Sequence, residues 1–243
     1  MHSSTEAAGV GSAYLLVGGG RMARHMGHYL DLLGIPWRGW RRGEGPEALA
    51  SAARDARAAL LLITDHALPF FLQEYGRLLG DAPRVHFSGS LELDGVQCCH
   101  PLGSFGPVLH PLSLYRRIVF VCDPGVPDFP TLFPGLPNPH RTLDPGLRAR
   151  YHALAVLSGN FTVLLWKKAR EEFSRMGLPG SATEAYMETV FANMSADLEG
   201  GLTGPLVRGD QQTLASNLRA LGSDPFAEVY RAFVRASGRE MPE

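Results

Sequence analysis

The chain has 243 residues, of which 45% are hydrophobic and 19% are charged, so it can bury a sizeable core in one or two domains. With 23 Lys and Arg against 24 Asp and Glu, its net charge of -1 excludes a global field that would draw it onto nucleic acid or an anionic membrane. The composition therefore favours a globular protein whose partner is a small molecule.

The sequence also indicates a compartment. Apolar stretches such as residues 58–63 fall far short of the roughly 18 residues that span a bilayer, and the first residues lack the pattern of a secretory signal. Cys98, Cys99 and Cys122 imply no disulfide framework, and they lack the spacing of a structural zinc site. We therefore expect a cytoplasmic protein with buried, apolar cysteines and no metal site.

Up to about residue 123, short apolar runs alternate with amphipathic segments, which predicts a parallel sheet covered by helices. About six strands are expected, at residues 13–17, 36–40, 59–63, 84–88, 96–100 and 117–122. Helices are expected between them, at residues 22–33, 47–56 and 69–79.

The pattern then changes. Seven prolines between residues 124 and 145 indicate a connector with at most one short helix. Apolar residues next recur at helical spacing within residues 146–176, and further helices are expected at residues 181–198, 210–221 and 225–236. The sequence thus predicts an α/β domain over residues 13–145 and an all-α domain over residues 146–243.

A glycine-rich run joins the first expected strand to the first expected helix. Gly18, Gly20 and Ala23 form a G-x-G-x-x-A fingerprint, in which the glycines allow a tight turn and a close pyrophosphate, and the alanine allows close helix packing. The helix start, with Arg21 and Met22, would face the phosphates with free N–H groups. This context predicts a Rossmann dinucleotide-binding domain, and a merely structural glycine turn is the alternative.

Basic residues stand where an NAD-binding domain has an acidic one. Arg41 and Arg42 follow the second expected strand, about 20 residues after the glycine loop. Two guanidinium groups suit the 2′-phosphate of NADP, so NADP is preferred over NAD. The alternative is a solvated surface pair, and Arg21 likewise either contacts phosphate or is exposed at the helix start.

Polar residues follow the next strands at the carboxyl edge, where ligands bind in open α/β sheets. Thr64 and Asp65 follow the third strand, and Ser88 and Gly89 follow the fourth. We expect all four at the cofactor site. Asp65 has an alternative role as the N-cap of the following helix.

Candidate catalytic groups come later in the chain. His100 follows the fifth strand and could transfer a proton near neutral pH, or it could simply bond the turn at Pro101. His152 and Asn160 lie eight positions apart on one helix and so roughly share a face. They either hold polar atoms of a substrate or are satisfied at a helix interface. Ser104 is a candidate hydroxyl near the nicotinamide.

A glycine-bordered loop between two of the later helices contains Thr203, Arg208 and Asp210. Arg208 could clamp an anionic substrate with its forked donors, with Thr203 beside it. The alternative is that Arg208 and Asp210 together cap the next helix.

Several runs in the sequence resemble a known family. They are residues 85–90 (VHFSGS), residues 100–105 (HPLGSF), Tyr-His-Ala and Ser-Gly-Asn within residues 151–160, and residues 202–210 (LTGPLVRGD). The chain resembles, from Ala13 to Tyr230, Rossmann-like proteins that carry a DUF2520 C-terminal domain. That family is similar to the pyrroline-5-carboxylate reductase, coenzyme F420-dependent NADP oxidoreductase and 6-phosphogluconate dehydrogenase-like group.

The resemblance implies a dinucleotide-binding domain and a helical domain that commonly dimerises, and the substrates of most members are not established. Gly159 departs from the family's usual pattern in the long helix, which is a small residue followed by Ser and Asn. This departure puts the role of Ser158 in doubt more than that of Asn160.

The leading hypothesis is an NADP-dependent oxidoreductase that transfers a hydride to or from a small carbonyl or imine held between the two domains. The rival is a non-catalytic dinucleotide-binding or sensing protein, favoured by the lack of an unmistakable catalytic constellation such as Tyr-x-x-x-Lys. We also expect a homodimer through the helical domain, because helices stacked on one small domain would leave an apolar face exposed.

Overall fold

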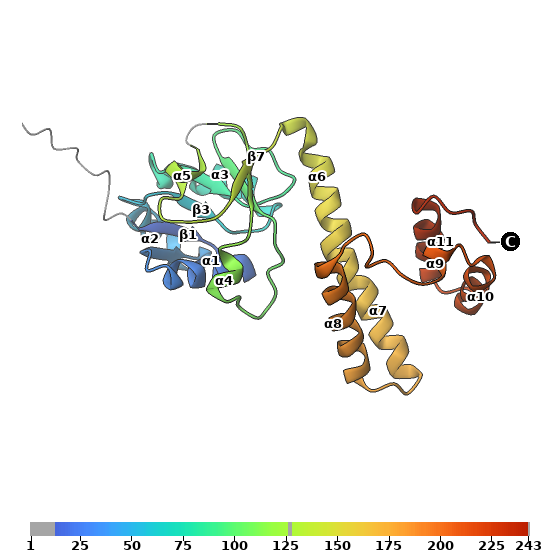
Figure 1. Cartoon of the computed structure of the whole chain (residues 1–243). Coiled ribbons are helices and arrows are strands. Elements are labelled where there is room, and N and C mark those ends of the chain that lie inside the picture. Colours follow the sequence, from blue (N-terminus) through green and yellow to red (C-terminus); the bar gives the residue numbers. More distant parts are fainter. Residues whose placement is uncertain (1–12, 126–127, 243) are drawn as a thin grey trace, which may run out of the picture. The chain divides into compact units, whose positions relative to one another are not determined.

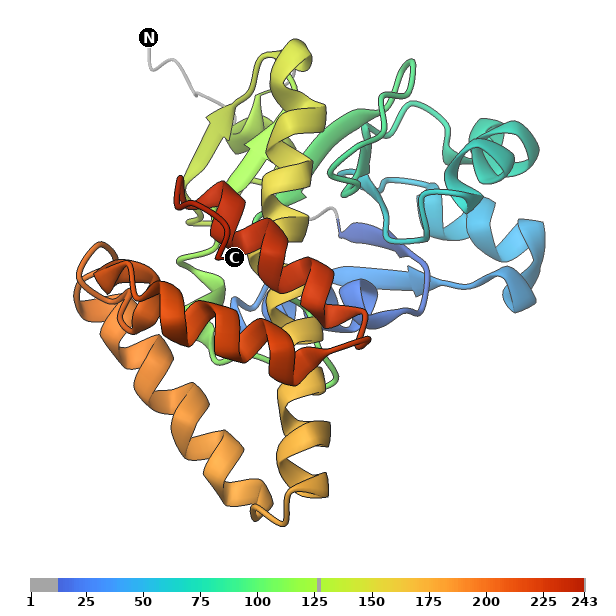
Figure 2. The ribbon, with the colours of Figure 1, turned by 90° about the vertical axis from the view of Figure 1, so that its right-hand side faces the viewer.

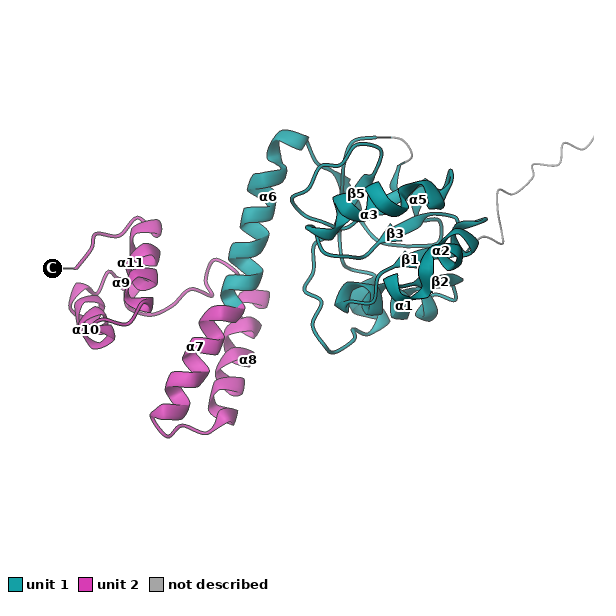
Figure 3. Ribbon diagram, turned by 180° about the vertical axis from the view of Figure 1, so that it is seen from behind, with its two compact units in different colours: residues 1–162 teal, residues 163–243 magenta. Residues whose placement is uncertain are grey.

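The computed structural model describes residues 13–125 and 128–242. The chain forms two compact units, residues 1–162 and residues 163–243, which are coloured separately in Figure 3. The domain boundary expected near residue 145 stays a prediction.

The first unit, which runs from blue to yellow in Figure 1, is built on a sheet. Among the described residues this sheet has seven strands in the order β2-β1-β3-β4-β5-β6-β7. Its strands are β1 (Tyr14–Val17), β2 (Trp37–Trp40), β3 (Ala59–Leu61), β4 (Arg84–His86), β5 (Gln97–Pro101), β6 (Phe120–Cys122) and β7 (His140–Thr142). The first five strands pair in parallel, with β2 on one side of β1 and β3 on the other. This reversal of strand order makes β1 the switch point of the sheet.

The sheet is not parallel throughout, which corrects the sequence prediction. β6 is antiparallel to β5, and β7 is parallel to β6. Parallel neighbours need a crossover, which is usually a full helix, whereas the β5–β6 connection holds only the four-residue α4 (Leu112–Tyr115). β7 lies inside the predicted connector and was missed, because three residues among prolines show no alternation.

Helices cover both faces of the sheet. One face packs against α1 (Arg21–Leu32), α4 and α5 (Phe129–Leu132). The other packs against α2 (Gly45–Ala53), α3 (Ala67–Tyr75) and the 3-10 turn η2 (Gly76–Leu79). All four residues of β1 are buried, which explains its unbroken apolar run, because a central parallel strand has no solvent face.

The long helix predicted over residues 146–176 is interrupted. A 3-10 turn (Pro145–Leu147) leads into α6 (Arg148–Ala155), and the π-helical segment η4 (Val156–Asn160) then joins α6 to α7 (Phe161–Arg175). Within it, the Ser158 hydroxyl donates to the Leu154 carbonyl oxygen at 2.8 Å. The regular 3.6-residue period, on which the shared face of His152 and Asn160 was predicted, therefore does not hold across this segment.

The second unit is helical among its described residues. It contains most of α7, then α8 (Gly180–Ala196), α9 (Pro205–Arg208), α10 (Gln211–Leu221) and α11 (Phe226–Ala236). α7 and α8 are joined by ring contacts of Trp166 with Tyr186 and Phe191. α10 lies beside α11 (Figure 2), and Asn217 donates to the Tyr230 hydroxyl at 3.1 Å. None of the described helices is long and apolar enough to cross a membrane.

Candidate functional site

A pocket of about 750 Å³ lies at the switch point of the sheet, where β1 and β3 end. Its polar and charged lining comes from the glycine loop, the start of α1, the end of β2 and the turn after β3. The lining residues are Val17, Gly18, Gly19, Gly20, Arg21, Met22, Trp40, Arg42, Leu62, Ile63, Thr64, Ala67, Phe71 and Phe105. The pocket therefore gathers several of the predicted cofactor-binding residues.

The glycine loop has the backbone that the fingerprint requires. Gly18 has a φ of 127°, and a Cβ atom there would lie 2.5 Å from the Leu62 carbonyl oxygen. Gly20 is the N-cap of α1, has no side-chain cap, and a Cβ atom there would meet nothing within 4 Å. The N–H groups of the first turn thus have no side-chain cap, as an anion site at a helix start requires. Ala23 is buried and packs in the core rather than against the pocket.

Three arginines surround this loop. Arg21 and Arg42 line the pocket, and all three side chains are exposed. Arg41 lies over the loop, because a Cβ atom at Gly19 would be 3.0 Å from its Nε atom. None of the described acidic side chains forms a salt bridge with Arg21, Arg41 or Arg42. Their positive charge is therefore available to an anion.

Asp65 does not cap α3, so the alternative role proposed for it is wrong. The N-cap of α3 is His66, and Asp65 stands one residue too early. Asp65 instead accepts hydrogen bonds from the Ser88 hydroxyl at 2.8 Å and the Ser90 hydroxyl at 3.4 Å. It thereby ties the turn after β3 to the turn after β4. Thr64 lines the pocket, while Asp65 and Ser88 do not.

His100 lies at the carboxyl end of β5 against the first turns of α6. Its Nδ1 atom is 2.7 Å from the Tyr151 hydroxyl oxygen, so its partner is this phenol and not the turn at Pro101. The His152 ring stands 6.0 Å away, edge to face. Burial, and secondarily the neighbouring His152 and Arg148, lower the pKa of His100 to about 4. The imidazole is therefore neutral at physiological pH.

His152 fits against Gly89. A Cβ atom at Gly89 would lie 2.2 Å from the His152 Nδ1 atom, so only glycine admits the ring here. That Nδ1 atom is buried and has no hydrogen-bond partner among the described residues. Gly89 is thus in contact with His152. The predicted roles of Gly89 in cofactor binding and of His152 in catalysis stay predictions.

An ion pair between buried Arg148 and partly buried Asp123 anchors α6 to the sheet. Arg148 is only 1% exposed, and its guanidinium pairs with Asp123 and donates to the Cys98 sulfur at 3.1 Å. His86, Cys98 and Asp123 carry ligand types that could hold a metal ion. The Arg148 guanidinium, however, already pairs with Asp123 and donates to Cys98. Burial also raises the pKa of the Cys98 thiol to about 12. This chemistry suits an anchor, not a cation site, because a metal needs a thiolate and no competing cation.

The cysteines are buried, as expected. Cys98 is nevertheless more than an apolar filler, since its thiol also donates to the Ser88 carbonyl oxygen at 3.1 Å.

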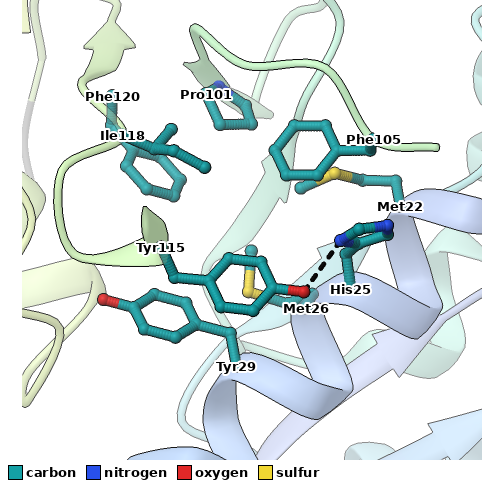
Figure 4. A pocket seen from close by; sticks show the side chains of 9 residues that line it. All are labelled: Met22, His25, Met26, Tyr29, Pro101, Phe105, Tyr115, Ile118 and Phe120. Carbon is teal, nitrogen blue, oxygen red and sulfur yellow. Dashed lines mark hydrogen bonds between the residues drawn. The ribbon is translucent and has the colours of Figure 1, made fainter. Parts of the chain in front are cut away.

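The loop after β5 is tied to α1 beside the glycine loop. Figure 4 shows the side chains that line a small apolar pocket between α1 and the segments around β5 and β6. This pocket has room for about 10 Å³. His25 closes one end of it, with its Nδ1 atom 2.8 Å from the Tyr115 hydroxyl and its Nε2 atom 2.9 Å from the Gly106 carbonyl oxygen. Phe105 lines both this pocket and the larger one. Ser104 faces elsewhere, in a separate pocket with His110.

The remaining predicted residues lie at the end of η4 or in the second unit. Asn160 is exposed at the end of η4. Asp210 is the N-cap of α10 and accepts from the Thr213 backbone N–H at 3.0 Å, as the capping alternative expects. Arg208 ends α9 and is exposed, as is Thr203. The substrate-binding roles of Thr203 and Arg208 stay predictions.

Residues 125–237 match the family described as "Domain of unknown function (DUF2520)". This match covers the C-terminal part of the chain. The family assignment agrees with the resemblance carried by the sequence runs, and the fold is Rossmann-like, with a mostly parallel sheet and a helical C-terminal region. A search of curated proteins finds no significant match.

Solved structures share the fold of this chain. A Bacteroides fragilis protein, provisionally named an NADP oxidoreductase, is 20% identical, with a TM-score of 0.72 over 93% of this chain and 97% of that chain. A Thermotoga maritima protein is 22% identical, with a TM-score of 0.70 over 92% of this chain and 97% of that chain. Pyrroline carboxylate reductase from Plasmodium falciparum, solved with NADP bound, is 11% identical. Its TM-score is 0.59 over 94% of this chain and 100% of that chain.

Two residues at the candidate site were not predicted from the sequence, namely Arg148 and Tyr151. An arginine at the start of an amphipathic helix normally lies in water, and no local pattern distinguishes a buried one. Tyr151 stood in a run that carried the family resemblance, which was the one signal that could have pointed to it.

Proposed function

We propose that the chain is an NADP-dependent oxidoreductase that transfers a hydride to or from a small carbonyl or imine. The observation that carries this proposal is the pocket at the switch point, which joins an uncapped helix start to unpaired arginines. The NADP oxidoreductase name and the NADP-bound reductase among the structural neighbours support it.

The described residues fit this cofactor. The backbone of Gly18 to Gly20 and the start of α1 would hold the pyrophosphate, because no side chain obstructs the approach at Gly20. Arg41 and Arg42 would bind the 2′-phosphate, and Arg21 would add a further donor. Thr64, with Asp65 and Ser88 behind it, would orient the part of the dinucleotide that continues across β3 and β4.

Bound NADP would supply or accept the hydride, and the chain would handle the proton. His100 is the proposed catalytic group, since a neutral imidazole can donate a hydrogen bond to a carbonyl oxygen and pass it a proton. His152 lies beside it with a free Nδ1 atom and would position a polar atom of the substrate. Asn160, Thr203, Arg208 and Ser104 are proposed as substrate contacts on the sequence analysis alone.

Removal of the two arginines after β2 tests the cofactor. We expect wild-type protein to bind NADPH more tightly than NADH in calorimetric titrations. In Arg41→Ala/Arg42→Ala, the NADPH affinity should fall about 10- to 100-fold, toward that for NADH, because charge-assisted bonds to the 2′-phosphate are lost.

Arg116→Ala/Arg117→Ala is the matched control, because it removes the same charge from an exposed pair outside the pocket. Binding of neither cofactor to wild-type protein would refute the proposal. If NADPH binds, a turnover screen with ketones and imines separates an enzyme from a non-catalytic dinucleotide sensor.

We further propose a homodimer through the helical region. On α7 and α8, large apolar side chains are between 41% and 56% exposed, namely Val163, Leu164, Tyr186, Phe191 and Met194. Exposed apolar side chains that gather into one patch are normally covered by a partner, which supports this proposal. Light scattering at micromolar concentration should give the mass of two chains, and a monomer mass would contradict the proposal.

A further inference from the structure

Tyr151 and His100 form a pair that neither the fingerprint nor the comparisons assign. The hydroxyl oxygen of Tyr151 lies 2.7 Å from His100 Nδ1, and the two rings meet edge to face at 81°. Among the described residues, the Tyr151 hydroxyl has no second hydrogen-bond partner. The phenol is therefore directed at one nitrogen of the imidazole.

The buried anchor determines where this pair forms. Arg148 and Tyr151 are three residues apart on α6, and Cys98 and His100 are two apart on β5, so each pair of residues shares one face of its element. Arg148 forms a hydrogen bond with Cys98, and Tyr151, three residues later on α6, forms one with His100, two residues later on β5. The ion pair with Asp123 thus holds α6 in the register that places the phenol on the imidazole.

The direction of this hydrogen bond follows from the phenol O–H, which has no other acceptor among the described residues and would be left unsatisfied if the imidazole donated. Burial raises the pKa of Tyr151 to about 12, while the pKa of His100 is lowered, so both side chains are neutral at physiological pH. A neutral imidazole donates from one nitrogen and accepts at the other. The other charged or titratable groups that act on His100 are His152, Arg148 and Asp65. With the phenol as donor, Nδ1 is the acceptor and the ring proton resides on Nε2.

We propose that Tyr151 is a positioning residue that donates its O–H to His100 Nδ1, fixes the Nε2–H tautomer and so makes Nε2 the proton donor to the substrate. The catalytic part rests on the proposed function. Bound NADPH would supply the hydride, the substrate oxygen would take the Nε2 proton, and Nδ1 would take the phenolic proton. Solvent would then return one proton to the Tyr151 phenolate, so the step consumes one hydride and one solvent proton.

Nitrogen NMR of the imidazoles tests the tautomer without any cofactor. We expect His100, assigned by the signals lost in His100→Gln, to be the Nε2–H form in wild-type protein. In Tyr151→Phe, both tautomers should appear. Tyr115→Phe is the matched control, since its phenol bonds His25 Nδ1 in the same way, at 2.8 Å, and should leave the His100 signals unchanged. An Nδ1–H tautomer in wild type, or an unchanged pattern in Tyr151→Phe, overturns the proposal.

Kinetics then test the catalytic consequence, using a substrate found by the turnover screen. Tyr151→Phe should lower kcat at least about tenfold and leave the NADPH dissociation constant unchanged. An unchanged kcat, with an altered tautomer, would overturn the proton-donor role. Failure of wild-type protein to bind NADPH would refute the proposed function alone, because the tautomer measurement stands without it.

Discussion

Asp123→Asn should lower the free energy of unfolding by about 3 kcal/mol, because it leaves the buried Arg148 guanidinium without its counter-charge. Arg148 has a side chain that is 2% exposed and cannot reach water without moving α6. Breaking a buried pair from one side is far more costly than losing an exposed one. Urea unfolding of wild type and variant at neutral pH measures the difference.

Two further variants make this expectation specific to the pair. Asp81→Asn removes an exposed carboxylate and should change the free energy of unfolding little. The double replacement Asp123→Leu/Arg148→Met should be less destabilising than Asp123→Asn, because no buried charge is then left alone. A double variant that loses as much as the sum of its singles would show that the two groups do not interact.

The same anchor connects stability to the candidate site. Arg148 begins α6, and Tyr151 and His152 follow it three and four residues later in the same helix. A shift of α6 would therefore separate Tyr151 from His100 and His152 from Gly89. Asp123→Asn should for this reason also weaken the tautomer preference of His100.

Gly20→Asp should abolish measurable NADPH binding, with an affinity loss of about a hundredfold or more. A carboxylate at this N-cap would occupy the open space at the helix start and repel the pyrophosphate. The fold should be retained, because aspartate is a favourable N-cap and the backbone at Gly20 has an ordinary extended conformation, with a φ of -75°. Calorimetric titration with NADPH, alongside thermal unfolding, separates the two effects.

Gly180→Asp is the matched control for this variant. Gly180 begins α8, and a Cβ atom there also meets nothing within 4 Å, so the same charge is added at another helix start. It should leave the NADPH affinity at the wild-type value. Equal affinities of Gly20→Asp and wild-type protein would mean that the glycine loop does not hold the cofactor.

Local chemistry was enough to predict the frame of the first unit. The glycine loop could be read from sequence because its requirement is local: Gly18 needs a positive φ and has no room for a Cβ atom. The strand β1 and the helix α1 were predicted within a residue or so, since apolar runs and helical periodicity act over neighbouring positions. The resemblance to the DUF2520 family likewise came from contiguous runs, and the family match agrees with it.

What the sequence by itself determined was thus the order of elements, the Rossmann-like frame and the position of the glycine loop. Only the tertiary structure decided that β6 runs antiparallel, that Asp65 bonds Ser88 rather than capping a helix, and that Arg148 is buried on Asp123. It also paired Tyr151 with His100, 51 positions away in the chain. Such contacts depend on the register between a helix and a strand that are distant in sequence, and no spacing rule along the chain encodes that register.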